Sequence, residues 1–333
     1  MHAVRLHAFG PAGNLTYETT DDPVPGPGPG QVRIAVAAAG VHLLDTALRE
    51  GAAGPFGAPA ELPTVPGREV AGTVDALGEG TDPAWLGKRV VAHLGMAPGG
   101  YAELAVTDAG RLHEIPGHLG ASEAVAMIGT GRTALGILQY TELGPDDTVV
   151  VPAAAGGIGT LIVQYAKNAG ATVVGLAGGP AKTARVRGNG ADLAVDYTLP
   201  DWPDTVRAHL GDRRATVVYD SVGGDAGRAA VGLLGEGGRH IVFGWSSQGI
   251  LSDNPLILTE EELAERGITS QSVLGPAMLE KAGGLRALET RALAEAAAGR
   301  LRPAVQPHPL ADAAGAHRAL ETRGTMGKVV LIP

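Results

Sequence analysis

The 333-residue chain contains no cysteine, which excludes disulfide bonds, thiolate metal ligands and a cysteine nucleophile. Aromatic residues make up only 4% of it, so its cores must be largely aliphatic. The formal net charge is −9 and no block of Lys and Arg occurs, which argues against nucleic acid or an anionic membrane as the main partner. The sequence also lacks an apolar run of membrane-spanning length and the apolar core of a signal peptide, so we expect a cytoplasmic protein.

The order of predicted elements indicates two domains. Residues 1–110 alternate short apolar strands with Gly- and Pro-rich turns, a pattern typical of a small β-rich domain. A helix is expected over 121–142, and helices and strands then alternate, which predicts a doubly wound parallel sheet. Its expected strands are 148–152, 172–176, 193–196, 215–220, 239–244 and about 268–274. A final strand in GKVVLIP needs a partner, for which the β-rich part is the natural choice. We therefore predict a discontinuous domain, 1–122 plus 276–333, and an inserted nucleotide-binding domain, 123–275.

Residues 148–170, TVVVPAAAGGIGTLIVQYAKNAG, carry the strongest functional signal. A buried strand, a turn of small residues and an amphipathic helix follow one another, as in a dinucleotide-binding unit. Ala154, Gly156 and Gly159 occupy the small-residue positions of G-x-G-x-x-G. Gly156 would let the backbone approach a pyrophosphate, and Gly159 would let the helix pack close to its strand. The alternative is an ordinary glycine-rich turn between a strand and a helix.

The end of the second strand of this unit lacks the acidic residue that usually binds the ribose 2′-hydroxyl of NAD. Lys182, Arg185 and Arg187 follow instead, and a cation there would bind a 2′-phosphate. NADPH is therefore predicted over NADH, with Lys182 as the main candidate because it lies in the first helical turn. The alternative is that these cations line an exposed helix face.

Ligands of doubly wound sheets bind at the carboxyl ends of the strands. The fourth strand ends in YDSVGG and the fifth in FGWSSQG. Residues there that should border the cofactor are Ser221, Val222, Gly223, Phe243, Gly244 and Trp245. For Trp245 the alternative is a packing role at a domain junction.

The chain resembles the medium-chain dehydrogenase/reductase superfamily over nearly its whole length, and within it the zinc-independent quinone oxidoreductases. The matching stretches are AAGVHLLDTALREG (38–51), PTVPGREVAGTVDALGEG (63–80), GGYAELAV (99–106), AAAGGIG (153–159), DYT (196–198), VVYDSVGGD (217–225), FGWSSQG (243–249) and GKVVLIP. The resemblance implies a GroES-like catalytic domain, a Rossmann domain, a cleft between them and a homodimer joined through the sheet edges.

The resemblance also assigns cofactor residues. In the family, a lysine after the second strand and the tyrosine of DYT commonly hold the 2′-phosphate, and these match Lys182 and Tyr197. The remaining cofactor-binding candidates are Thr133, Gly157, Ile158, Gly178, Ser246 and Lys328.

The family's active-site strip, N-x-x-D-x-Y-x-R-x-G, matches His42, Asp45, Ala47, Arg49 and Gly51 here. Histidine in place of asparagine can donate a hydrogen bond to a carbonyl or titrate near neutral pH. Alanine in place of tyrosine removes a hydroxyl and would widen the pocket. The alternative for His42 is a packing residue whose imidazole bonds to the backbone.

Arg68 and His93 complete the candidate catalytic set, which otherwise comprises His42, Asp45 and Arg49. Arg68 is expected to form a structural ion pair with Glu69. Zinc-dependent relatives carry Cys, His and Cys where this chain has His42, Arg68 and Thr130. Only Glu69 remains as a plausible ligand beside His42, so no metal is expected.

These features predict an NADPH-dependent reductase that transfers hydride to a quinone or a similar conjugated carbonyl, without a metal. An enoyl or alkenal reductase that reduces an activated C=C bond is the nearest alternative. A non-catalytic NADPH-binding protein is the third possibility, kept open by Ala47. The expected partners are a small-molecule substrate and a second copy of the chain.

Overall fold

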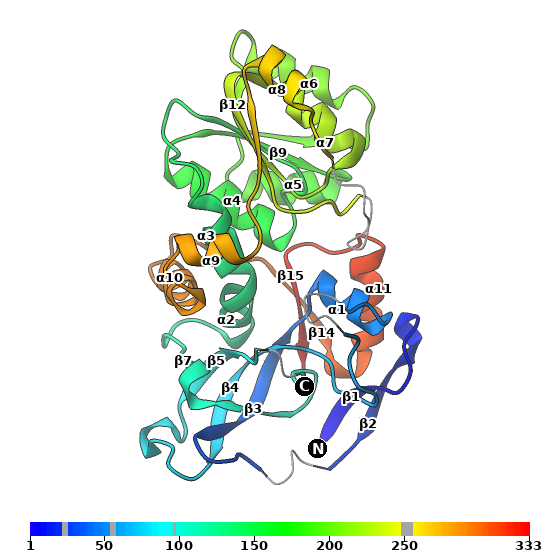
Figure 1. Ribbon diagram of the computed structural model, residues 1–333, viewed down its shortest axis with the longest axis vertical. Helices are drawn as coiled ribbons and strands as arrows, with labels where there is room; N and C mark the ends of the chain where they lie inside the picture. The colour runs from blue at the N-terminus through cyan, green and yellow to red at the C-terminus, as the bar shows by residue number, and fades with distance from the viewer. Residues whose placement is uncertain (22–25, 54–57, 96–97, 248–255) are drawn as a thin grey trace. The chain divides into compact units, whose positions relative to one another are not determined.

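The computed structural model describes residues 1–21, 26–53, 58–95, 98–247 and 256–333. Residues 248 and 249 of the FGWSSQG motif lie outside these ranges. The chain forms two compact units (Figure 1). The first unit comprises Met1–Thr130, Ala292–Ala297 and Pro303–Pro333, and the second unit comprises Gly131–Arg291 and Ala298–Arg302.

These spatial units differ from the predicted domain limits, which remain a prediction, mainly over residues 276–291. This segment groups with the second unit because it packs on α3 (Arg132–Leu138). The Gln139 side chain donates to the Met278 carbonyl over 2.8 Å, and Arg132 pairs with Glu289 at 2.8 Å.

The first unit is built on a seven-stranded sheet, in which six strands follow the order β14-β15-β3-β4-β5-β7 and β6 pairs with β3. Alternation in β3 buries Val32 and Ile34 in the core. Its strands are β3 (Gln31–Gly40), β4 (Glu69–Leu77), β5 (Arg89–His93), β6 (Leu104–Asp108), β7 (His113–Glu114), β14 (Val305–Pro309) and β15 (Lys328–Ile332). The predicted pairing of the C-terminal strand with the β-rich part is confirmed, because β15 runs antiparallel to β3.

A separate two-stranded sheet and a few helices complete the first unit. They are β1 (His2–Leu6), β2 (Leu15–Thr19), α1 (Leu43–Arg49), α2 (Ala121–Ala126) and α11 (Ala313–Glu321).

The second unit contains a six-stranded parallel sheet of order β10-β9-β8-β11-β12-β13, which is 3-2-1-4-5-6 in chain order. The predicted doubly wound parallel sheet is thereby confirmed. The strands are β8 (Thr148–Val151), β9 (Thr172–Ala177), β10 (Leu193–Asp196), β11 (Ala215–Asp220), β12 (Leu234–Val242) and β13 (Thr269–Ser272). The strand order reverses between β8 and β11, so a ligand site is expected beyond Val151 and Asp220.

The helices that accompany this sheet cover apolar strand residues such as Val150 and Val218. They are α4 (Gly157–Asn168), α5 (Pro180–Gly188), α6 (Trp202–Leu210), α7 (Gly224–Val231) and α8 (Glu260–Arg266); α9 (Pro276–Lys281) and α10 (Leu285–Ala297) follow. Two of the elements, α6 and β14, lie outside the predicted set.

The helix predicted over 121–142 is present, but it contains a wider segment and ends earlier, at Leu138. The chain forms α2, then a π-helical segment η5 (Met127–Gly131), then α3. Gly129 in η5 lies against Glu69, whose carboxylate would overlap a Cβ at this position. The widened turn and its glycine therefore leave room for a buried acidic side chain.

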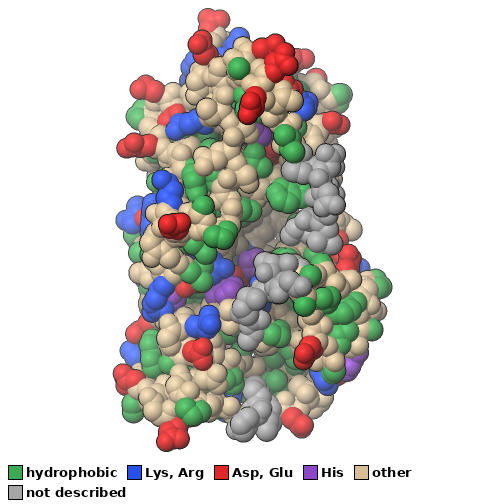
Figure 2. Space-filling model, viewed as in Figure 1, with side chains coloured by type: hydrophobic (Ala, Val, Ile, Leu, Met, Phe, Trp, Pro, Cys, Tyr) green, Lys and Arg blue, Asp and Glu red, His purple; other side chains and the backbone are tan. Residues whose placement is uncertain are grey.

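Across the described residues, no helix combines the length and the apolar character that crossing a membrane requires. On the face shown in Figure 2, Lys and Arg side chains are interspersed with Asp and Glu.

Candidate functional site

His42 in the first unit lies between an acidic and a basic side chain. It is the N-cap of α1, where its backbone N–H donates to Asp45 Oδ2 over 2.8 Å. Its Nε2 is 2.6 Å from Glu69 Oε2 and 2.7 Å from Lys328 Nζ. Lys328 Nζ is also 3.1 Å from Glu69 Oε2. Nε2 of the imidazole is therefore held between two side chains.

The three side chains in these contacts differ in their exposure to solvent. The Glu69 side chain is 0% exposed, Lys328 is 5% exposed and His42 is 28% exposed. A buried carboxylate needs a cationic partner, which Lys328 provides. Gly40 permits the approach, because a Cβ there would lie 2.5 Å from Glu69 Oε2 and 3.1 Å from Lys328 Cε. Of the three groups, His42 is the one that remains open to a substrate.

Arg68 lies beside the carboxylate of Asp45. Its Nη2 lies 3.9 Å from Asp45 Oδ1, whereas Glu69 pairs with His42 and Lys328. The predicted Arg68–Glu69 ion pair stays a prediction. Asp45 also receives both the His42 backbone N–H and the Tyr101 hydroxyl.

A buried polar network lies behind Asp45. Tyr101 Oη donates to Asp45 Oδ2 over 3.2 Å and lies 3.1 Å from His317 Nε2. Burial, together with the charge of Asp45, raises the pKa of Tyr101 well above 10. Burial lowers the pKa of His317 to about 4, and the nearby Arg49 charge acts in the same direction. Both groups keep one protonation state near neutral pH, so the network supports Asp45 without titrating.

Arg49 is engaged by the protein itself. Its guanidinium donates to the Gly10 carbonyl over 2.9 Å and pairs with Glu50 at 2.7 Å and Glu321 at 2.5 Å. The side chain is 1% exposed. These contacts support a role in holding α1 in place, while the predicted catalytic role stays a prediction. Ala47 on the same helix is also buried.

His93 ends β5 directly opposite Glu69 in the antiparallel register. Its Nδ1 accepts the Gly95 backbone N–H over 3.0 Å. The structure thus brings His93 next to the strand position of Glu69, and its catalytic role remains a prediction.

The predicted nucleotide turn of the second unit joins β8 to α4. Ala154 N donates to Leu176 O over 2.9 Å, which fixes the turn on β9, and Gly156 is the N-cap of α4. A Cβ at Gly159 would lie 2.5 Å from Ala153 O, so glycine is needed for close packing, as expected. A Cβ at Gly156 would meet a single atom, Ala153 O at 3.2 Å. The outer side of Gly156 is therefore open, and a helix N-terminus follows it at Gly157 and Ile158.

The loop after β9 contains Gly178 and Gly179, and Gly179 has a φ of +82°. Asp196 at the end of β10 accepts hydrogen bonds from Thr198 and from the Gly179 backbone, which lower its pKa. Lys182, in the first turn of α5, and Tyr197, next to Asp196, are both half-buried. The carboxylate of Asp196, at the end of the third strand of this sheet, β10, thus supports the loop that leads to Lys182.

Hydrogen bonds join the loops after β11 and β12. Ser246 N donates to Ser221 O over 3.0 Å, and Ser247 N donates to Val222 O over 2.9 Å. A Cβ at Gly244 would lie 3.1 Å from Ser221 O. Trp245 Nε1 is buried and has no hydrogen-bond partner among the described residues. Because an unsatisfied buried donor is costly, this N–H indicates a position for an acceptor atom of a ligand.

The cofactor candidates therefore form one group with two outliers. Those of the second unit cluster at the turn before α4, the loop after β9 and the loops after β11 and β12. Thr133 is half-buried on α3, and Lys328 lies in the first unit beside Glu69. The pairing of His42 with Lys328 could not be read from the sequence, since 286 positions separate them. Within the described ranges, no three His, Asp or Glu side chains group as metal ligands would.

A parallel sheet of order 3-2-1-4-5-6 with a glycine turn before α4, and a separate β-rich unit, define a dehydrogenase/reductase class of protein. Family models agree: residues 28–117 match the alcohol dehydrogenase GroES-like domain, and residues 157–282 match the zinc-binding dehydrogenase family.

Individual relatives define the branch. Quinone oxidoreductase 1 of Escherichia coli (strain K12) is 31% identical over 300 residues, 89% of each chain. The 2-haloacrylate reductase of a Burkholderia species is 32% identical over 338 residues, 99% of this chain and 98% of the relative. The crystal structure of E. coli quinone oxidoreductase complexed with NADPH superposes with a TM-score of 0.82 at 26% identity, covering 100% of both chains. This chain belongs to the quinone oxidoreductase branch of the medium-chain dehydrogenase/reductase superfamily, and it is an oxidoreductase.

Proposed function

We propose that the protein is an NADPH-dependent reductase that transfers hydride to a quinone or a similar conjugated carbonyl compound without a metal ion. The observation that carries this proposal is the open glycine turn before α4 with Lys182 in the first turn of α5, where an NAD site has an acid. The relatives named quinone oxidoreductase support the acceptor class.

The second unit has groups that fit NADPH. The α4 N-terminus offers backbone N–H groups to the pyrophosphate, and Lys182 and Tyr197 are suited to the 2′-phosphate. Trp245 Nε1, which has no hydrogen-bond partner among the residues that the structure describes, offers a further donor. Bound NADPH supplies the hydride. A solved relative was crystallised with NADPH, which supports the choice.

The first unit provides a group that can hold and deliver a proton. When His42 Nε2 carries no proton, Lys328 Nζ can donate a hydrogen bond to that nitrogen. When Nε2 carries a proton, Glu69 Oε2 can accept it at 2.6 Å. We therefore assign to His42 a hydrogen bond to the acceptor oxygen and transfer of a proton to it.

The same charges are the reason to propose a metal-independent reaction. The Lys328 ammonium group lies 2.7 Å from His42 Nε2, one of the two ring nitrogens through which a histidine binds a metal. Two cations would compete for Glu69 and His42, and zinc sites normally use three protein ligands or more. Lys328 therefore takes the place of a metal in neutralising Glu69.

A second candidate function is reduction of an activated C=C bond, because a relative named 2-haloacrylate reductase matches 99% of this chain. Both reactions place negative charge on an oxygen conjugated to the reduced atoms. The same His42 donor would serve either of them, so the geometry does not choose between the two acceptors.

Oxidation of NADPH with a panel of quinones and matched enones tests the proposal. We expect turnover with quinones, and higher turnover with NADPH than with NADH. Turnover with enones alone would replace the quinone assignment by the C=C assignment. Binding of NADPH without turnover of any acceptor would establish the non-catalytic alternative. The cytoplasmic location and the homodimer remain predictions. Sedimentation equilibrium of the purified protein would test the homodimer.

A further inference from the structure

Three neighbouring strands of the second unit carry a chain of polar side chains that the cofactor site does not use. Asp220 Oδ1 on β11 accepts the backbone N–H groups of Val222 at 2.8 Å and Gly223 at 3.0 Å. Its Oδ2 lies 3.3 Å from Nε2 of His240 on β12, and His240 Nδ1 lies 2.9 Å from Oγ of Ser270 on β13. The Asp220 and His240 side chains are both 0% exposed.

The carboxylate at one end sets the direction of this chain. A carboxylate has no hydrogen to donate, so the hydrogen of a neutral imidazole belongs on Nε2, facing Asp220. His240 Nδ1 then carries a lone pair, and the Ser270 hydroxyl must donate its only hydrogen to it. Ser270 Oγ is thereby left with lone pairs alone, and it can only accept a hydrogen bond from a further group.

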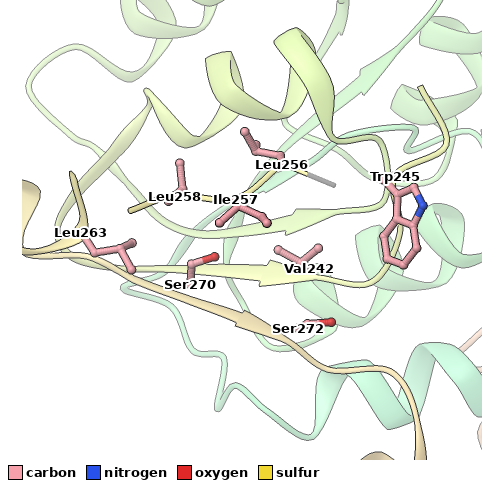
Figure 3. A pocket seen from close by; sticks show the side chains of 8 residues that line it. All are labelled: Val242, Trp245, Leu256, Ile257, Leu258, Leu263, Ser270 and Ser272. Atoms are coloured by element: carbon pink, nitrogen blue, oxygen red, sulfur yellow. The ribbon is translucent and has the colours of Figure 1, made fainter. Parts of the chain in front are cut away.

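That oxygen borders an apolar cavity of about 410 Å³. In Figure 3, Ser270 lies between Leu263 and Val242, with Ile257 and Leu258 across the cavity. The Trp245 indole nitrogen is on the side away from Val242, so it does not serve this cavity (Figure 3). The lining comprises Val242, Trp245, Leu256, Ile257, Leu258, Leu263, Ser270 and Ser272.

We propose that this cavity is a binding site for a small apolar molecule that carries one hydrogen-bond donor, of the phenol or alcohol class, which donates to Ser270 Oγ. Pockets of this volume, mostly apolar and with a few placed polar groups, are typical of small-molecule sites. With a neutral His240, the direction of the Asp220–His240–Ser270 chain gives the specificity, since a ligand offering only an acceptor would face lone pairs. This site rests on the cavity and its polar chain, and it does not depend on the proposed reductase activity.

A matched pair of ligands tests the proposal. 2-Naphthol and 2-methoxynaphthalene share the apolar ring system, but the second lacks the donor hydrogen. By titration calorimetry of the full chain, we expect 2-naphthol to bind about fivefold more tightly, which corresponds to one hydrogen bond. Ser270→Ala should bring the ratio of the two affinities close to one. Ser272→Ala, in the same lining but outside the polar chain, should keep the ratio.

Two results would overturn the proposal. One is that neither compound binds at millimolar concentration, and the other is that Ser270→Ala leaves the preference for 2-naphthol unchanged. The second result would also arise if 2-naphthol bound only at the reductase site. A further measurement uses the unaltered protein: with ¹⁵N-labelled histidine, 2-naphthol should shift the His240 Nδ1 resonance more than 2-methoxynaphthalene does, and equal shifts would contradict the assignment.

Discussion

Three histidines of this protein show how the neighbours of one side chain decide its use. His42 is partly exposed between a carboxylate and an ammonium group, and so a substrate could reach it. His240 is buried and bonded at both ring nitrogens. His317 is buried beside Arg49, which together with burial keeps it neutral. Their chemistry follows from contacts across the fold and not from the residue type.

We predict that His42→Ala lowers kcat/KM by roughly 10²-fold, the scale expected for loss of one donor or general acid in the transition state. His42→Asn, which restores a neutral donor, should recover much of this loss. NADPH affinity should barely change in either variant. Steady-state kinetics and a fluorescence titration of the cofactor would check these outcomes.

The same variants should be compared by melting temperature, because His42 also contacts the buried Glu69–Lys328 pair. If His42→Ala lowered the melting temperature but left turnover per folded molecule unchanged, His42 would be a structural residue.

His317 gives a pH prediction. Its pKa falls from 6.5 to about 4 in the folded protein, so the unfolded chain takes up a proton first on acidification. With respect to His317, the free energy of unfolding has its full value above pH 6.5. It decreases by about 3 kcal/mol as the pH falls towards 4. Urea unfolding at several pH values should show a shallower decline for His317→Gln. The exposed His209→Gln variant serves as the control and should retain the full decline.

At this scale the sequence identifies candidates but not their partners. His42 stands in a recognisable strip, so its importance could be predicted. Lys328 and Glu69 meet it only through the pairing of β15, β3 and β4. His240 gives a weaker signal, a polar residue inside the apolar strand sequence RHIVFG.

At the scale of elements, the turn between β8 and α4 has two glycines with different duties. Gly159→Ala should lower the melting temperature, because its Cβ would lie 2.5 Å from Ala153 O and 2.8 Å from Ala154 Cα. Gly156→Ala should lower the melting temperature little, since the outer side of Gly156 is open. It should weaken NADPH binding, because the added methyl group would occupy the side from which the pyrophosphate approaches the backbone. Thermal melts and cofactor titrations of both variants would separate these effects, and equal loss of NADPH affinity at equal stability would contradict them.

The junction of β9, α5 and β10 predicts cofactor preference. NADPH should bind at least tenfold more tightly than NADH, since Lys182 can pair with the 2′-phosphate and no acid follows β9 directly. Lys182→Ala and Tyr197→Phe should shrink the difference by weakening NADPH alone. Nicotinamide fluorescence titrations measure both constants, and equal affinities of the unaltered protein for the two cofactors would refute the prediction.

Most elements could be predicted from periodicity, and those that could not have physical reasons. Prolines 307 and 309 argue against a strand at β14, yet β14 is the edge of its sheet, where a missing N–H is tolerated. Helix α6 begins with Trp202 and Pro203, and its sequence alone is also compatible with a turn, so the packing is needed to identify the helix. The π-helical segment within 121–142 depends on Glu69, which is distant in the sequence.

At the scale of the whole molecule, the proposed reaction leads to a prediction about metal content. Purified protein should contain no stoichiometric metal and should keep full activity in a chelator, because Lys328 already neutralises Glu69. Elemental analysis and assays with and without chelator check this. One zinc ion per chain, with activity lost on its removal and regained on its return, would show that Lys328 moves aside for a metal.

The placement of β15 has a consequence for biosynthesis. All six strands of the second unit lie within residues 148–272, so this sheet can assemble while the ribosome is still adding residues. The sheet of the first unit has to wait, because β15 inserts between β14 and β3 and is translated some 290 residues after β3. Until then the nascent chain holds an uncovered strand edge and a carboxylate, Glu69, whose lysine has yet to be made. The second unit, although it is synthesised after β3 and β4, can thus complete its sheet first. The first unit is the part that a chaperone would need to protect until β15 has been made.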